Sequence, residues 1–90
     1  MAARNRIVIA HELMHILGAS DKYDPRTGQP FAPDGLANPS KIPLYPQNQA
    51  EIMAGRIAVS ASSWAQPTSL SACVIGEVTA SEIGWLPEVD

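Results

Sequence analysis

Residues 11–24 read HELMHILGASDKYD, and this stretch carries most of what the sequence indicates about fold and chemistry. His11 and His15 stand four residues apart, so a helix would place them one turn apart on the same face, close enough to share one metal ion. Imidazole suits zinc, and His-Glu-x-x-His on a helix is typical of zinc peptidases. Glu12 falls off the histidine face, where it could reach a metal-bound water rather than the metal. The plain alternative is a core helix whose two histidines are satisfied by hydrogen bonds.

A catalytic zinc site needs a third protein ligand and one open position. Gly18 permits a sharp turn after the helix, which would direct Asp21 back toward the two histidines. The alternative third ligands are glutamates further along the chain, namely Glu51, Glu77 and Glu82. Glu77 is the best of these alternatives, since Glu82 has an expected role in a helix cap.

Calcium is the alternative metal ion. Asp21, Asp24 and Asp34 offer the carboxylate oxygens that calcium prefers, although their spacing matches no EF-hand loop.

The apolar pattern predicts a helix over residues 5–17, with Asn5 as its N-cap and Gly18 just beyond its end. Apolar residues lie nearly all round this helix, so we expect it to be buried. The β-branched run at 7–9 favours a short strand instead, but the histidine spacing requires the helix.

The rest of the chain falls into two further parts. Six of the eight prolines lie in residues 24–49, and no 2- or 3.6-residue period runs through them, which predicts a long irregular loop. Near the end, Thr79 and Glu82 form a capping-box pattern, which predicts a short helix beginning at Ala80.

Together these features predict a single domain over residues 1–90 that is mainly α with long irregular loops. An apolar fraction of 46% is normal for a globular chain. A net charge of −3 without a basic cluster argues against nucleic-acid binding. We find no signal-peptide pattern and no apolar run long enough to span a membrane.

The segment HELMHILGASD has the form H-E-x-x-H-x-x-G-x-x-D and resembles the extended zinc signature of the metzincin clan of metallopeptidases. Aspartate in the last position resembles snapalysin-like enzymes, and the continuation DKYD resembles immune-inhibitor-A-type peptidases. This resemblance implies a catalytic zinc ion held by His11, His15 and Asp21, with Glu12 as general base.

The resemblance also implies further features of the chain. A methionine-containing turn beneath the metal would be AEIMAG (50–55), with Met53 as its methionine, and the helix at 80–86 would follow it. A tyrosine assisting at the oxyanion would be Tyr23 or Tyr45. Zincins carry a β-sheet before the active-site helix, so the chain is expected to be the active-site helix and C-terminal subdomain of an α+β zincin fold.

The implied function is zinc-dependent hydrolysis of peptide bonds in a peptide or protein substrate, by a zinc-bound water with Glu12 as general base. The alternative is a zinc-binding fragment without turnover, or a module that depends on a partner chain or on a missing upstream half of the domain.

Overall fold

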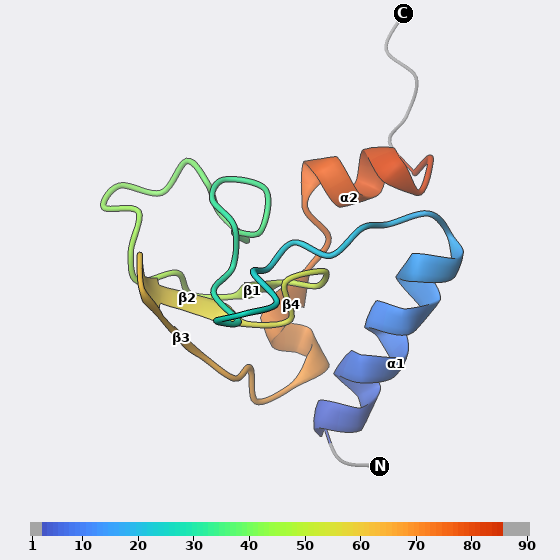
Figure 1. The fold of residues 1–90 in the computed structure, drawn as a ribbon, viewed down its shortest axis with the longest axis horizontal. Coiled ribbons are helices and arrows are strands. Elements are labelled where there is room, and N and C mark those ends of the chain that lie inside the picture. The colour runs from blue at the N-terminus through green and yellow to red at the C-terminus, as the bar shows by residue number, and fades with distance from the viewer. Residues whose placement is uncertain (1–2, 86–90) are drawn as a thin grey trace, which may run out of the picture.

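The computed structural model describes residues 3–85, which form a small mixed α/β domain (Figure 1). Helices take up 26% of the chain and strands 19%, so the expectation of a mainly α fold is wrong. The element order is α1 (Ala3–Ile16), β1 (Ala50–Glu51), β2 (Ile57–Ser60), β3 (Ser63–Ala65), the 3₁₀ helix η1 (Leu70–Ala72), β4 (Cys73–Val74) and α2 (Glu77–Glu82).

The strands form two small sheets. In one, β1 and β4 run parallel, with Ala50 opposite Cys73 and Glu51 opposite Val74. In the other, β2 and β3 form an antiparallel hairpin whose register shifts between Ala58 and Ser60. A two-residue strand carries no alternating pattern, so β1 and β4 exist through their mutual pairing rather than through local preference.

The helix predicted over residues 5–17 is present as α1, but it begins at Ala3 and ends at Ile16. Asn5 therefore lies inside the helix and is not its N-cap, and the expected burial of the helix is wrong as well. Ile7 is 7% exposed and packs into the core, whereas Ile16 is 80% exposed. The other large apolar side chains of α1 that are exposed are Val8, Ile9 and Leu13. Figure 1 shows α1 at one side of the domain, so only one of its faces meets the rest of the chain within residues 3–85.

The helix predicted to begin at Ala80 begins three residues earlier, at Glu77, with Gly76 as its N-cap. Thr79 is therefore inside the first turn, and its side chain is fully buried. Glu82 is the last residue of the helix, and its carboxylate binds the Lys22 amine and Ser20 instead of capping the start of the helix. The expected capping box is wrong because these tertiary contacts engage the Glu82 carboxylate.

Residues 24–49 contain no helix and no strand beyond isolated bridges. They are held down at a few points. Leu36 is 2% exposed and pairs with Ala50. The buried Gln47 side chain exchanges hydrogen bonds with both backbone groups of Asn38 and donates to the carbonyl of Leu44. Because a buried side-chain amide satisfies these backbone hydrogen-bonding groups, the proline-rich segment can keep one conformation without regular secondary structure.

The core lies between α1 and the turn after β1. Its buried members are Ile7, Ala19, Ile52 and Met53, and the partly buried residues around them are Ala10, Met14, Cys73, Ile75 and Ile83. This packing brings the histidine face of α1 against the chain at residues 50–55.

Candidate metal centre

The helix α1 places His11 and His15 side by side. Their ring centroids lie 4.7 Å apart, and their Nε2 atoms lie 3.1 Å apart. The side chains are 15% and 32% exposed, respectively, so the pair is open to solvent on one side only.

The second nitrogen of each ring faces a backbone carbonyl. His11 Nδ1 lies 2.9 Å from the Ile52 oxygen, and His15 Nδ1 lies 2.8 Å from the Ala19 oxygen. A carbonyl can only accept, so both Nδ1 atoms must carry a proton and donate. In the neutral rings both Nε2 atoms then present lone pairs to each other, which is the orientation that metal-binding histidines adopt.

The chain turns sharply after α1 and returns Asp21 to the histidines. Gly18 has φ +109°, its N–H donates to the His15 carbonyl, and the Ala19 N–H donates to the Met14 carbonyl. These two bonds make a Schellman motif, which ends a helix in a left-handed residue. As a result, Asp21 Oδ1 lies 2.9 Å from Nε2 of both histidines.

With Asp21 ionised, no arrangement of protons satisfies this triangle of atoms. If both histidines are neutral, three acceptors face one another. If one is protonated at Nε2, the Asp21 oxygen still meets the bare Nε2 of the other. If both are protonated, two N–H groups face each other across 3.1 Å. Zinc binds such nitrogen and oxygen donors at about 2.0–2.2 Å, which sets tetrahedral donors roughly 3.3–3.6 Å apart. The donor types and their convergence fit a zinc ion, and the three atoms, 2.9–3.1 Å apart, would have to separate by a few tenths of an ångström to hold it.

Two carboxylates compete for the third ligand position. Glu12 offers an oxygen within 4.8 Å of the ligand nitrogens of His11 and His15. Asp21 is much closer, at 2.9 Å from both, so the shorter contact favours Asp21 as ligand and leaves Glu12 beside the site. Glu12 is exposed and lines a cavity of about 200 Å³ next to His11.

Two of the three glutamates considered as alternative ligands are engaged elsewhere, and the third lines a different cavity. Glu82 binds Lys22 and Ser20, and these contacts, the Lys22 amine above all, lower the pKa of Glu82 to about 2. Glu51 is fully buried and accepts the N–H groups of Met53 and Gly76. Glu77 lines a different cavity of about 470 Å³, at the start of α2.

Met53 lies in the turn that follows β1, and its side chain is fully buried. Hydrogen bonds join this turn to two segments of the centre. The Ile52 carbonyl accepts one from His11 on α1, and the Met53 carbonyl accepts one from the N–H of Lys22, next to Asp21. The Met53 side chain belongs to the core cluster with Ile7, Ala19 and Ile52.

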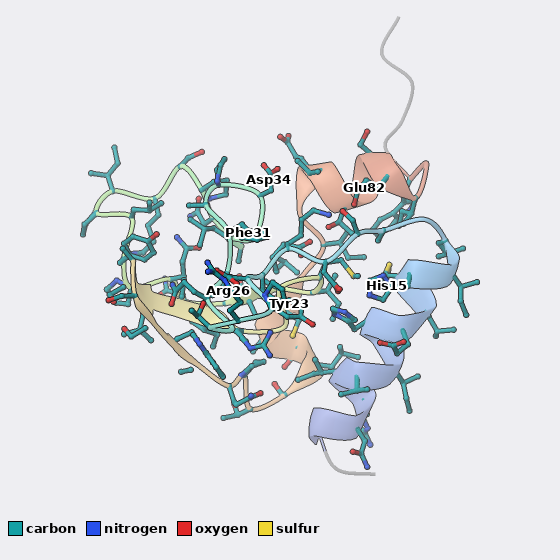
Figure 2. The ribbon with its side chains drawn as sticks, viewed as in Figure 1. His15, Tyr23, Arg26, Phe31, Asp34 and Glu82 are labelled. Atoms are coloured by element: carbon teal, nitrogen blue, oxygen red, sulfur yellow. The ribbon has the colours of Figure 1, made fainter. Side chains whose placement is uncertain are left out.

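The two tyrosines lie in different surroundings. The Tyr23 ring centroid is 6.4 Å from that of His11, and Tyr23 lines the same cavity as Glu12. Figure 2 shows Tyr23 on the segment that leads from the end of α1 toward the strands. Tyr45 lies in the proline-rich loop and is not among the residues that line this cavity.

The three aspartates considered for calcium do not gather at one point. Asp21 belongs to the histidine centre, and Asp24 pairs with Arg26, whose hydrogen bonds lower the pKa of Asp24. Asp34 is exposed and lines the cavity at the start of α2, well away from His15 in Figure 2.

Sequence reasoning missed several groups around the centre. The carbonyls of Ile52 and Ala19 orient the histidines, and no sequence pattern identifies a backbone oxygen. Arg56 lines the cavity beside Glu12. The sequence indicates only that a cationic residue follows Met53 by three positions, which does not place it in the cavity. Lys22 is 4% exposed and joins the Asp21 segment to Glu82 on α2.

No protein-family model, no curated protein and no solved structure matches this chain. Across residues 3–85, neither helix has the length and apolar character needed to cross a bilayer.

Proposed function

We propose that this chain is a zinc-dependent peptidase, with His11, His15 and Asp21 holding the metal and Glu12 acting as general base. The observation that supports the proposal is the triangle of two Nε2 atoms and one carboxylate oxygen, with sides of 2.9, 2.9 and 3.1 Å. A bound zinc ion would supply a Lewis acid that polarises the scissile carbonyl and acidifies water.

The chain's own residues supply the remaining chemistry. Glu12 carries a free carboxylate at the edge of the centre, facing a cavity that can admit substrate. It would take a proton from the attacking water on one carboxylate oxygen and pass that proton to the leaving amine nitrogen. The hydrogen bonds from both Nδ1 atoms keep the two rings in place during this exchange.

The experiment is the Glu12→Gln variant, compared with the zinc-loaded wild-type chain on a protein substrate. Zinc content should stay at one ion per chain, while hydrolysis should fall roughly 10²–10⁴-fold, as expected for loss of general base catalysis. Glu77→Gln is the matched control, since Glu77 is also exposed but lines another cavity, and it should leave both quantities unchanged. Equal hydrolysis by wild type and Glu12→Gln would refute the assignment.

A second function, a zinc-binding module that works only with a partner chain, is favoured by one observation. The outward face of α1 exposes several large apolar side chains, and Ile9 and Leu13 are 46% and 54% exposed. Such patches are common where another protein surface packs. The discriminating result is a chain that binds one zinc ion and cleaves nothing by itself, but gains activity when a partner segment is added.

A further inference from the structure

The cavity beside the metal centre contains a cation that the proposed chemistry does not use. Arg56 lines this cavity together with His11, Glu12 and Tyr23. The cavity measures about 200 Å³, which is enough for one side chain or one chain terminus of a peptide.

The Arg56 guanidinium lies over two aromatic rings, those of Tyr23 and Trp64. Its central carbon lies 4.3 Å from the centroid of Tyr23 and 4.8 Å from that of Trp64. Trp64 is itself fixed, because its Nε1–H donates to the Thr27 carbonyl. Arg56 also donates one hydrogen bond to the Ala54 carbonyl over 3.1 Å. Since the rings cover the centre of the guanidinium, its remaining terminal N–H groups are the part that can bind a ligand.

Arg56 has no anionic partner within residues 3–85, because no carboxylate of the described part of the chain lies within ion-pair distance of it. Its Nε atom is buried without a hydrogen-bond partner, so a ligand in the cavity would meet the terminal Nη1 and Nη2 groups. By contrast, Lys22 is paired with Glu82 and Arg26 with Asp24. A partly buried cation with unfilled donors is costly unless a ligand completes it.

We propose that Arg56 recognises a carboxylate of the substrate and so makes the enzyme selective for acidic peptides; this inference rests on the proposed peptidase function. A guanidinium binds a carboxylate through two parallel hydrogen bonds, which fixes the orientation of the ligand as well as its position. With a dication at the histidines, positive charge outweighs the carboxylates of Glu12 and Asp21, so the loaded cavity attracts an anion. The carboxylate is either a Glu or Asp side chain near the scissile bond or the free C-terminus of the peptide.

The test measures peptide binding by the zinc-loaded Glu12→Gln variant, which should bind without turnover. One set of hexapeptides is blocked at both ends and carries a single Glu, moved through the six positions in turn. Each has a partner with Gln in the same position, and a third set carries Gln but a free C-terminal carboxylate. At the favoured position, the carboxylate peptide should bind about tenfold more tightly than its amide partner, as expected for a charged hydrogen-bond pair.

Adding Arg56→Gln should abolish this preference. Arg56→Lys should keep part of it, because lysine retains the positive charge but lacks the paired N–H groups of the guanidinium. Arg26→Gln is the matched control, since its side chain is 86% exposed and it does not line the cavity. Circular dichroism checks that each variant is folded. A stronger response to the blocked Glu set identifies a side chain as the ligand, and a stronger response to the free C-terminus identifies a terminal carboxylate.

The two proposals fail in different ways. Cleavage of Glu and Gln peptides at equal rates, with equal binding, would overturn the role of Arg56 and leave the peptidase proposal standing. Binding that prefers the carboxylate and depends on Arg56, in a zinc-loaded wild-type chain that cleaves nothing, would support the anion site and remove the peptidase function.

Discussion

Zinc binding should stabilise the folded chain, because the three donor atoms meet only when the chain is folded. His11 and His15 lie on α1, whereas Asp21 reaches them through the turn at Gly18. An unfolded chain has no such convergence, so the metal binds the native state preferentially. A free zinc concentration of 100 times the dissociation constant then adds about 2.7 kcal/mol to the free energy of unfolding. In a domain of this size each kcal/mol raises Tm by roughly 4–8 °C, so the expected shift is roughly 10–20 °C.

The assay is thermal unfolding followed by circular dichroism, with buffered zinc and after chelation. His15→Ala should remove the shift because it takes away one of the three donor atoms. Asp21→Asn should reduce the shift because it replaces the carboxylate with an uncharged amide. Asp34→Asn is the control, since Asp34 is an exposed aspartate of the other cavity, and it should respond to zinc as the wild type does. A wild-type Tm that does not change between chelated and zinc-loaded samples would refute the reasoning from the donor triangle. An equal shift in the Asp21→Asn and wild-type chains would refute the role of Asp21.

Two further predictions concern stability. Gly18→Ala should lower the free energy of unfolding by about 1–2 kcal/mol in urea titrations, because Gly18 has φ +109° and a Cβ there would lie 3.1 Å from the Glu82 carbonyl oxygen. Gly84→Ala, also at positive φ but with nothing within 4 Å, should cost less, and an equal or smaller cost for Gly18 would contradict the steric argument. The pKa of Glu82 is lowered from 4.5 to about 2 by Lys22 and Ser20, so its contribution to stability is present above pH 4.5 and is lost as the pH falls toward 2. Glu82→Gln should therefore lower the free energy of unfolding by about 1 kcal/mol at pH 7, which is less than the pKa shift alone implies because solvent screens this partly exposed pair. Near pH 2 the substitution should have no effect. A difference between the two chains that persists at low pH would show that the ion pair is not its cause.

The local parts of the candidate site could be predicted from the sequence. The four-residue spacing of His11 and His15 has meaning only on a helix, and α1 is present. Gly18 predicted the end of that helix, and the structure shows it at positive φ in a Schellman motif. These predictions succeeded because helix period and glycine turns depend on neighbouring residues alone.

Most of the wrong predictions concerned contacts between distant segments, although the local hairpin of β2 and β3 was also missed. The mainly α expectation failed because β1 and β4 are two residues long and pair across more than twenty residues. The capping box failed because Lys22 and Ser20 bind the Glu82 carboxylate. The prediction that α1 is buried failed because an apolar pattern indicates which residues can be buried, not which residues pack against another segment.

The sequence by itself determined the donor types, their order and the turn that allows them to meet. The tertiary structure alone decided which carbonyl holds the Nδ1 atom of His11, that Glu51 and Glu82 are engaged away from the Nε2 atoms, and which cation lines the cavity. The physical reason is the separation in sequence over which each interaction acts. Backbone conformation in a helix or a glycine turn is set within a few residues, and this turn also returns Asp21 to the histidines, whereas the Ile52 carbonyl and Arg56 reach the centre only through packing of segments that lie far apart in the chain.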